Sequence, residues 1–303
     1  MYERLLNNGN ITLFSPADVP GLYEAFFADQ EKFQELYERA ERNTRLRKKT
    51  IKASALFSTF MEERKNTGRI YLMNVDHAND HGSFKPDVAP IHQSNLCCEI
   101  DLPTKPLNDY NDSEGEIALC TLSAINWGLI RDPKDFEKPC ELAVRGLDAL
   151  LSYQNYPVEA ARTSTMNRRP LGVGIINLAY FLETKYGDGI TPNQTYKKDV
   201  DELVPHKERM DWKSLRKQLA ETGIRNSTLM ALMPAETSAQ ISNATNGIEP
   251  PRSYVSVKQS KDGVLKQVVP GYPRLKNKYD LLWDQKSPQG YLSIMAVLQK
   301  YID

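Results

Sequence analysis

The residues best suited to chemistry lie between Ser94 and Ile100, in the segment Ser-Asn-Leu-Cys-Cys-Glu-Ile. If this segment is extended, its side chains alternate between two faces, and Asn95, Cys97 and Glu99 share one of them. A cysteine sulfur can take part in covalent or one-electron chemistry, a carboxylate can move a proton, and an amide can orient a hydroxyl group. Placed together in a pocket, these three side chains would form a working catalytic set.

The same spacing also has a purely structural interpretation. The segment would equally be an edge strand with a solvated polar face and a buried Cys98 on its apolar face. Cys120, in an apolar run, and Cys140, on one face of a predicted helix, are typical of packed core thiols. The four cysteines are too few for a disulfide scaffold, and they lack the CxxC spacing of structural zinc sites.

A candidate phosphate site follows the apolar run that ends at Met233. Thr237 and Ser238 are small hydroxyl residues that could begin a helix, where exposed N–H groups and the positive end of the helix dipole suit a phosphate. Most helix starts with threonine or serine are ordinary caps, so this pattern alone leaves both interpretations open.

His77 and His81 have the i,i+4 spacing of a zinc site carried on a helix. Ala78 stands where that motif needs a glutamate, and the polar residues and glycine that follow disfavour a helix. We therefore expect loop histidines and no metal site.

Hydrophobic periodicity predicts the elements that would position these residues. Helices are expected from Ser15 through Phe26, from Asp29 to Ala40, from Leu56 up to Gly68, from Pro139 to Tyr153, from Trp212 to Glu221 with Gly223 as C-cap, and from Ser287 to Leu298. Strands are expected at 69–75 and 227–233, together with a hairpin over 254–269 that turns at 260–263. The run 171–176 is apolar and interrupted by glycines, and 76–92 is expected to be a loop. Strands that alternate with helices, without repeats or linkers, predict a single α/β unit.

Composition excludes several classes of protein. The 303 residues, of which 40% are hydrophobic, are sufficient for a packed core. Thirty-nine Lys and Arg residues balance thirty-nine Asp and Glu residues, so no net charge draws the chain to nucleic acid or to an anionic membrane. There is no apolar run of about 18 residues and no basic-then-apolar leader, and we expect a cytoplasmic protein.

Several separate motifs closely resemble the large, catalytic subunit of class I ribonucleotide reductase. They follow the family order and comprise Ser94–Asp109, Gly115–Gly128, Arg168–Leu182 and Trp212–Gly263. The last block has the family's signature spacing from Trp212 through Gly223 and Asn226 to Pro234. So many independent motifs in one order exclude a chance match.

The resemblance implies a fold and a domain organisation. The family fold is a ten-stranded α/β barrel whose central finger loop carries a radical cysteine, and Asn95–Glu99 corresponds to that loop. Residues 1–303 would then form part of this catalytic barrel domain. Residues 1–68 would be a mainly helical lead-in, and residues 69–303 would supply barrel strands, the finger loop and the phosphate-binding segment.

The resemblance also implies roles for individual residues. Cys97 would be the thiyl radical that removes the ribose 3′ hydrogen, Glu99 the base at the 3′ hydroxyl group, and Asn95 the group that orients the sugar hydroxyls. Cys120 matches one of the two cysteines that reduce the 2′ carbon and finish as a disulfide. Substrate contacts would come from Asn95, Leu96, Cys97, Cys98 and Glu99 and, around the diphosphate, from Pro234, Ala235, Glu236, Thr237 and Ser238.

The implied activity is the reduction of ribonucleoside diphosphates to deoxyribonucleoside diphosphates, the step that supplies DNA replication. The resemblance implies that this chain binds no metal or cofactor directly. A metal-containing small subunit would supply the radical, and an external dithiol of the thioredoxin or glutaredoxin type would supply the electrons. No nucleic acid or membrane partner is expected.

The chain also departs from the family. The family subunit is much longer, and the match is to the second half of its barrel, without the allosteric region, the partner of Cys120, the radical-transfer tyrosine pair or the C-terminal cysteine tail. The connection between Leu182 and Thr195 is several dozen residues shorter than usual, and Cys98 stands where an aliphatic residue is common. Half a barrel leaves open sheet edges and uncovered apolar surface, so we expect it to need a complementary N-terminal fragment.

Two alternatives compete with a catalytic fragment. The first is a non-catalytic remnant that keeps only an assembly or binding surface, although the intact set of Asn95, Cys97, Glu99 and Cys120 disfavours it. The second is a related glycyl-radical enzyme, which is disfavoured because the matched motifs are those of the class I subunit.

Overall fold

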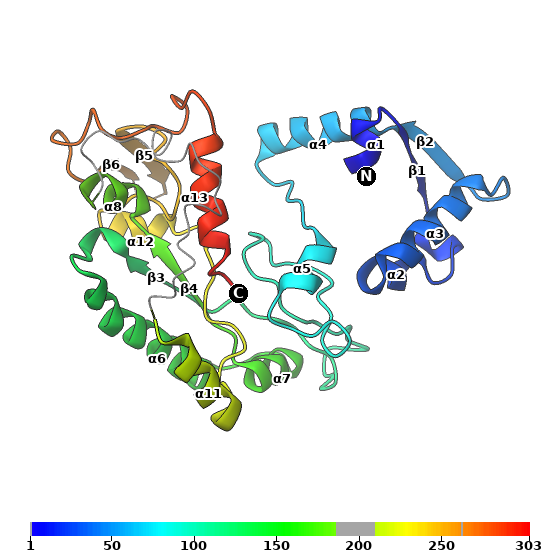
Figure 1. The fold of residues 1–303 in the computed structure, drawn as a ribbon, viewed down its shortest axis with the longest axis horizontal. Coiled ribbons are helices and arrows are strands. Elements are labelled where there is room, and N and C mark those ends of the chain that lie inside the picture. The colour runs from blue at the N-terminus through cyan, green and yellow to red at the C-terminus, as the bar shows by residue number, and fades with distance from the viewer. Residues whose placement is uncertain (1, 186–209, 262) are drawn as a thin grey trace. The chain divides into compact units, whose positions relative to one another are not determined.

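The computed structural model describes residues 2–185, 210–261 and 263–303. The chain divides into two compact units, unit 1 (Met1–Pro106) and unit 2 (Leu107–Asp303) (Figure 1). Helices and strands are mixed, as predicted for an α/β protein, but the described residues form three two-stranded sheets and no closed barrel. The expected short connection between Leu182 and Thr195 falls largely outside the described residues, and a boundary at residue 68 stays a prediction.

Unit 1 is mainly helical and carries one antiparallel ribbon. Its elements are α1 (Tyr2–Leu6), β1 (Asn10–Phe14), the 3-10 turn η1 (Pro16–Asp18), α2 (Leu22–Ala28), α3 (Gln30–Arg42), β2 (Lys48–Lys52), α4 (Ala53–Thr67) and α5 (Val75–His81). Leu22 and Ala25 of α2 pack against Leu36 and Ala40 of α3 in a buried cluster. The helix predicted from Ser15 onward begins only at Leu22, because the segment before it forms the 3-10 turn.

The ribbon of β1 and β2 was not predicted, because its residues lack a clear apolar period. Thr12 pairs with Thr50, and their hydroxyl groups share a hydrogen bond of 3.1 Å. The hydroxyl group of Tyr37 in α3 donates to the Thr12 carbonyl oxygen at 2.8 Å. Arg4 and Glu41 form an ion pair of 2.6 Å. These contacts between residues distant in sequence tie the ribbon to the helices.

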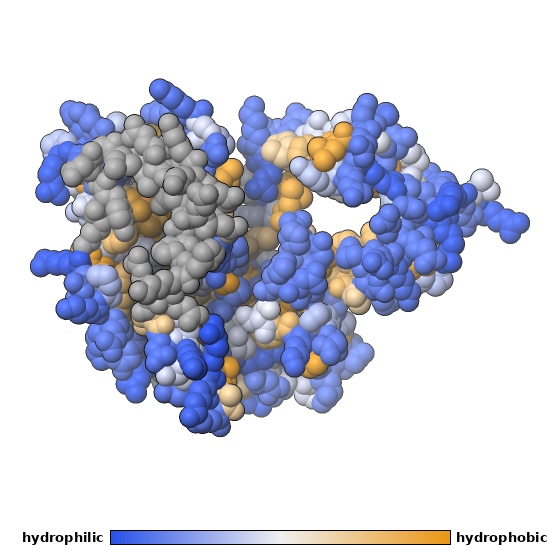
Figure 2. All heavy atoms as spheres, in the orientation of Figure 1, coloured by the Kyte–Doolittle hydropathy of each residue, from blue (hydrophilic) through white to orange (hydrophobic). Residues whose placement is uncertain are grey.

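Two predicted helix ends in unit 1 are confirmed. Asp29 caps α3 by accepting a hydrogen bond from the Lys32 N–H group at 2.9 Å. Gly68, with a φ of 66°, ends α4 in the left-handed conformation that glycine adopts most readily. Only Ala53 of α4 is buried, and Figure 2 shows hydrophobic atoms gathered over this helix.

The predicted strand at 69–75 is wrong, and the loop predicted over 76–92 is wrong for residues 76–81. Residues 69–74 have no regular structure, and Val75 begins α5. Asn79 explains the helix, since its buried side-chain amide donates to the carbonyl oxygens of Val75 at 2.8 Å and Ile91 at 2.9 Å. Its Oδ1 accepts from the Ile91 N–H group at 2.8 Å. These bonds offset the poor helix propensity of asparagine.

Unit 2 contains the α/β part of the chain. Its elements are β3 (Leu122–Asn126), the 3-10 turns η2 (Trp127–Leu129) and η3 (Pro133–Phe136), α6 (Glu137–Tyr153), α7 (Glu159–Arg168), β4 (Gly172–Ile176), α8 (Leu178–Lys185), α11 (Trp212–Thr222), α12 (Glu236–Ile241), β5 (Val255–Ser260), β6 (Gly263–Val268) and α13 (Gln289–Gln299). The predicted helices at 139–153, 212–221 and 287–298 are confirmed, and the apolar run at 171–176 contains the strand β4. The predicted hairpin is confirmed as β5 and β6, which pair in antiparallel register.

The central sheet of unit 2 is parallel. β3 pairs with β4, and α6 and α7 form the crossover between them, which is the usual connection of parallel strands. The predicted strand at 227–233 runs along the other side of β4, where the Val173 N–H group donates to the Leu229 carbonyl oxygen at 2.8 Å. This segment forms an isolated bridge between Val173 and Met230 rather than a full strand.

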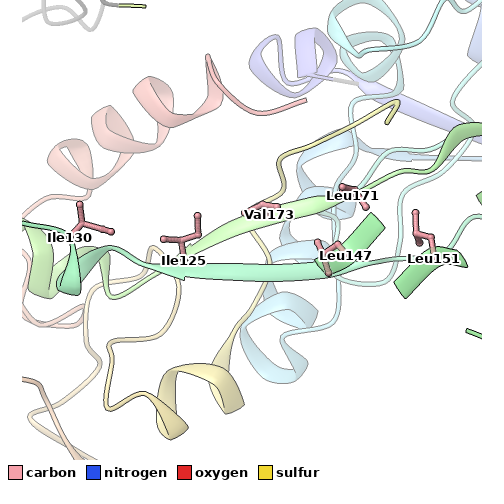
Figure 3. Close-up of a cluster of buried hydrophobic side chains, with 6 residues drawn as sticks. All are labelled: Ile125, Ile130, Leu147, Leu151, Leu171 and Val173. Carbon is pink, nitrogen blue, oxygen red and sulfur yellow. The ribbon is translucent and has the colours of Figure 1, made fainter. Parts of the chain in front are cut away.

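One face of this sheet packs on α6. Figure 3 shows Ile125 of β3 and Leu171 and Val173 of the β4 region in a buried cluster with Leu147 and Leu151 of α6. Leu151 has no exposed surface. The apolar spacing that predicted α6 therefore marks the helix face that covers the sheet.

The other face of the sheet packs toward α12. Leu122 and Ala124 of β3 contact a buried cluster that consists of Ile176, Met233, Ala235, Ala239 and Ala244. Gly174 permits this close packing, because a Cβ atom there would lie 2.5 Å from the Ala231 carbonyl oxygen. The fold thus fixes α12 against the sheet. No helix among the described residues is both long and apolar enough to cross a bilayer.

Candidate functional site

The segment from Ser94 to Asp101 is a hairpin-like loop, so the prediction of an extended strand is wrong. Its ends meet in an antiparallel bridge between Ser94 and Asp101, and the Asn95 N–H group donates to the Ile100 carbonyl oxygen at 3.2 Å. At the tip, the Cys98 N–H group donates to the Asn95 carbonyl oxygen at 3.1 Å and closes a turn. Side chains do not alternate through a turn, so the predicted single face of amide, thiol and carboxylate does not exist.

The side chain of Asn95 accounts for this loop. Its Oδ1 accepts hydrogen bonds from the backbone N–H groups of Glu99 at 3.1 Å and Ile100 at 3.2 Å. Asparagine favours such local bonds, which compete with extended structure. The amide that was predicted to orient a substrate hydroxyl group therefore also shapes the loop that carries the thiol.

The turn nonetheless keeps the thiol and the carboxylate in electrostatic contact. Cys97 is exposed, and its pKa is raised by desolvation and, after that, by the negative charge of Glu99. Glu99 is half-buried, and its buried Oε2 makes no hydrogen bond to any described residue. A buried polar atom without a partner costs stability, which is a feature of groups retained for function. An accessible thiol beside an unsatisfied carboxylate can exchange hydrogen atoms and protons with a ligand.

The other two residues of the loop tip differ in exposure. Leu96 is 84% exposed. Cys98 is half-buried and has a φ of 60°, a left-handed conformation that costs a non-glycine residue on the order of 1 kcal/mol. The loop tip therefore presents two adjacent thiols of unequal exposure.

Cys120 is exposed, and its interpretation as a packed core thiol is wrong. It lies two residues before β3, and Thr121 still pairs with β4 because its carbonyl oxygen accepts from the Gly172 N–H group at 2.9 Å. Alternation carried back from Leu122 places Cys120 on the face of β3 that packs toward α12. Cys140, in contrast, packs against the core as predicted, and burial raises its pKa.

The predicted phosphate segment does begin a helix. No side chain caps the first turn of α12, and the Ala235 N–H group before it donates to Asn246 Oδ1 at 3.1 Å. The exposed residues of the segment are Pro234, Glu236, Thr237 and Ser238. The first N–H groups of a helix have no acceptor within the helix, so this turn presents donors to an anion.

Two asparagines that brace this segment were missed by the sequence analysis. Asn246 holds Ala235, and Asn177 accepts from the Thr245 N–H group at 2.9 Å while it donates to Asn126 Oδ1 at 2.9 Å. Together they attach the loop that follows α12 to the end of the sheet. Their partners are distant in sequence, so no local spacing marks them.

A cavity of about 250 Å³ lies beside α12. Glu236 and Gln240 of α12 line one side, and Ser256, Lys258 and Gln267 of the β5–β6 hairpin line the other. The Gln267 Nε2 atom donates to the Ala244 carbonyl oxygen at 3.0 Å, which fixes the hairpin against the loop after α12. The predicted phosphate segment thus lies beside a cavity of unit 2 that is lined by both polar and apolar residues.

The two histidines with i,i+4 spacing lie on a helix. His77 and His81 lie on α5, where a loop was expected, and their ring centroids are 5.8 Å apart. Within the described ranges, no group of three His, Cys, Asp or Glu side chains is placed to bind a metal ion.

The candidate site therefore has two parts. Asn95, Cys97 and Glu99 lie in one loop of unit 1, whereas Cys120 and the start of α12 lie on one face of the sheet in unit 2. Their meeting around one ligand stays a prediction.

Comparisons with known proteins give one consistent result. The family described as "Ribonucleotide reductase, barrel domain" matches residues 1–186 and 179–303. The ribonucleoside-diphosphate reductase subunit alpha of Haemophilus influenzae is 53% identical to this chain, the ribonucleoside-diphosphate reductase 1 subunit alpha of Escherichia coli 51%, and the subunit alpha of Enterobacteria phage T4 40%. Each alignment covers 100% of this chain and 46% of the relative. The chain thus spans about half the length of the curated relatives it matches.

The alignments also bear on the connection after α8. The alignment with the H. influenzae relative has 348 positions against 303 residues of this chain, so at least 45 positions of the relative have no counterpart here. The two matched parts of the family meet at residues 179–186, beside the connection that was expected to be short.

Proposed function

Because this chain belongs to the ribonucleotide reductase family, we propose that it provides the radical loop and the diphosphate-binding segment of a class I ribonucleoside-diphosphate reductase large subunit. The observation that carries this proposal is the exposed Cys97 thiol beside Glu99, whose buried Oε2 makes no hydrogen bond to a described residue. A thiol and an unsatisfied carboxylate are the two groups that radical reduction of a ribose needs.

Cys97 and Glu99 act at the 3′ position of the ribose. The Cys97 thiyl radical takes the 3′ hydrogen atom, so that an S–H bond forms and a carbon radical remains at C3′. Glu99 accepts the proton of the 3′ hydroxyl group, and a thiol of the cysteine pair that includes Cys120 protonates the 2′ hydroxyl group, so that the C2′–O bond breaks and water leaves. The Oε2 atom that makes no hydrogen bond to a described residue is suited to this proton.

Cys120 supplies reducing power at the 2′ carbon. Together with a second cysteine on the complementary part of the subunit, it delivers two electrons and finishes as a disulfide. Its exposure fits this role, because a redox thiol must reach both the substrate and an external dithiol. Cys97 then returns its hydrogen atom to C3′, which restores the thiyl radical.

The start of α12 binds the diphosphate. Its first-turn N–H groups and the hydroxyl groups of Thr237 and Ser238 are exposed donors, and negative charge is stabilised at a helix N-terminus. This arrangement would hold the diphosphate end of the substrate in place.

Completion of the barrel requires a partner. The outer edge of β3 has no strand partner among the described residues, and α4 has one buried residue, Ala53. Open edges and apolar surface favour association, so the proposed partners are the complementary part of the large subunit, which would complete the ten-stranded barrel around the finger loop, and a metal-containing small subunit that generates the radical. An assembly of this kind would work in the cytoplasm.

Reconstitution tests the proposal. The chain is mixed with a complementary N-terminal large-subunit fragment, a C-terminal piece and the radical-generating small subunit, and the product from a ribonucleoside diphosphate is measured. We expect deoxyribonucleotide from the native chain, none from Cys97→Ser, and retained activity in Cys140→Ala, the matched cysteine control outside the site. No product from the native chain, or equal product from Cys97→Ser, would refute the proposal.

A second candidate function is a non-catalytic binding or assembly module. At least 45 positions of the H. influenzae relative lack a counterpart in this chain, and this favours the alternative, because a changed connection could disable the enzyme. Equilibrium dialysis of the assembly with a labelled nucleoside diphosphate separates binding from turnover. Thr237→Val with Ser238→Ala should abolish binding, and Thr222→Ala on exposed α11 is the matched control. If the native assembly binds the nucleoside diphosphate but forms no product, the non-catalytic binding module is the correct function.

A further inference from the structure

The loop tip carries two neighbouring thiols, of which the proposed function uses one for radical chemistry. Cys97 is exposed and Cys98 is half-buried, and neither forms a disulfide. We propose that Cys97 and Cys98 are a pair of thiols that a hydroperoxide oxidises reversibly to a disulfide between adjacent residues. The formation of this disulfide does not depend on the proposed function. Only its expected effect, the loss of reductase activity, rests on the proposed function.

The loop holds this pair at an accessible point. The bridge between Ser94 and Asp101 closes the base of the loop, and Asn95 Oδ1 holds the N–H groups on the return side. The tip beyond these bonds is open to solvent, since Leu96 is 84% exposed. A small oxidant can therefore reach the Cys97 sulfur, and Cys98 follows it in the same turn.

Oxidation by a hydroperoxide balances in two steps. The Cys97 thiolate attacks one peroxide oxygen, an S–O bond forms, the O–O bond breaks, and water leaves once the departing oxygen is protonated. The Cys98 thiolate then attacks the Cys97 sulfur, an S–S bond forms, the S–O bond breaks, and a second water leaves. Overall, two thiols and one hydrogen peroxide give one disulfide and two waters.

The electrostatic environment of Cys97 makes the neighbouring Cys98 thiol important for protecting the oxidised Cys97. The pKa of Cys97 is raised by desolvation and by Glu99, so its thiolate fraction is small and the first step is slow. The sulfenic acid that forms is exposed to further, irreversible oxidation unless another thiol captures it. Cys98 is the next residue in the chain, and capture there requires no encounter with a second molecule.

Geometry makes the bond easy to reverse. Adjacent Cα atoms lie about 3.8 Å apart across a trans peptide, whereas disulfides usually join Cα atoms separated by about 4.4–6.8 Å. A disulfide between neighbours is therefore strained, and strain makes a disulfide easier to reduce. An external dithiol, the class of reductant that the proposed function already needs, would restore both thiols. While the bond exists, Cys97 cannot become a thiyl radical.

Peptide mass analysis of the full chain tests the pair directly. The chain is treated with hydrogen peroxide, remaining thiols are alkylated, and cleavage before aspartates releases residues 87–100, which contain Cys97 and Cys98 and no other cysteine. We expect this peptide to lack two hydrogen atoms, to resist alkylation, and to take two alkyl groups after treatment with a dithiol. In Cys98→Ala, the same peptide should instead gain oxygen atoms on Cys97.

The matched control is the double variant Cys120→Ser with Cys140→Ser, which should form the same bond. The proposal is overturned if both thiols of peptide 87–100 stay alkylatable while other cysteines oxidise, if the peptide is cross-linked to one that contains Cys120 or Cys140, or if Cys97 becomes irreversibly oxidised in the native chain. This readout is independent of reductase activity, so an inactive assembly would refute the proposed function and leave the disulfide result intact.

Discussion

Asp148 joins three segments of unit 2, and its replacement should destabilise that unit strongly. Its carboxylate accepts from Arg169 Nε at 2.7 Å, from Arg225 Nε at 2.9 Å and from Asn226 Nδ2 at 3.0 Å. The side chain of Arg169 is only 9% exposed. The Arg169 guanidinium and, after it, Asn226 and Arg225 hold the pKa of Asp148 well below its usual range, against the opposing effect of burial.

Asp148→Ala leaves the buried Arg169 charge without a carboxylate. Removing one partner of a buried ion pair costs about 3–5 kcal/mol. Arg169 keeps hydrogen bonds to the Asp148 carbonyl oxygen at 2.6 Å and to Ser152 Oγ at 2.9 Å, so we expect the lower end, about 3 kcal/mol. Glu159→Ala is the matched control, because it breaks an ion pair with Arg162 between exposed side chains, and its urea midpoint should stay close to that of the native chain.

Urea unfolding followed by tryptophan fluorescence measures the unfolding free energies of Asp148→Ala and Glu159→Ala. The signal reports on unit 2, because Trp127, Trp212 and Trp283 all lie there. The folded-state pKa of Asp148 lies below its unfolded value, so its contribution is complete above the unfolded pKa of about 4 and is lost as pH falls through the folded pKa. The gap in unfolding free energy between the native chain and Asp148→Asn should therefore narrow in acid. An Asp148→Ala variant as stable as Glu159→Ala, or a gap that stays constant in acid, would refute the reasoning.

Three further predictions concern other parts of the fold. Gly174→Ala places a Cβ atom 2.5 Å from the Ala231 carbonyl oxygen and should lower the unfolding free energy of unit 2 by about 2 kcal/mol; an unchanged urea midpoint would contradict this. Burial and the charge of Asp280 raise the pKa of Glu183 to about 7, so unit 2 should lose stability as pH rises from the unfolded pKa toward 7. Glu183→Gln should remove that slope, and parallel pH profiles of the urea midpoint would count against it. Asn79→Ala removes three hydrogen bonds and should destabilise α5 by about 2 kcal/mol, measured as faster amide hydrogen exchange at 75–81; native exchange rates would disprove the role of this amide.

Local signals predicted much of the secondary structure. Asp29 and Gly68 act as the helix caps that their residue types indicate, and Gly223, with a φ of 74°, ends α11. The apolar run at 171–176 forms the fully buried strand β4. Each helix end is determined by an interaction between residues close in sequence. The burial of β4 follows from the apolar residue types of the strand itself.

Contacts between distant residues account for most of the errors in the fold. The β1–β2 ribbon depends on Tyr37 and on the pair of Thr12 with Thr50, and α5 depends on bonds from Asn79 to Ile91. The spacing of apolar residues along the chain gives no information about such distant partners. A segment with weak intrinsic preference therefore takes the structure that its tertiary hydrogen bonds select.

The candidate site shows a different kind of error. The sequence analysis chose Asn95, Cys97 and Glu99 because their side chains would share one face of an extended strand. The segment is a loop instead, because Asn95 Oδ1 accepts hydrogen bonds from the backbone of its own turn. Family resemblance selected the same residues through motif order, which does not depend on that geometry. The apolar run around Cys120 suggested burial, yet the thiol is exposed where the segment enters the sheet.

The most direct measurement of the central claim uses the reconstituted assembly and a ribonucleoside diphosphate that carries deuterium at the 3′ carbon. If the Cys97 sulfur removes that hydrogen, the native chain should form product more slowly from the deuterated substrate than from the ordinary one. Cys97→Ser should form none from either, and Cys140→Ala should show the same isotope effect as the native chain. The claim would be contradicted if Cys97→Ser formed product. It would also be contradicted if the native assembly turned over without breaking the bond between the substrate's 3′ carbon and its hydrogen.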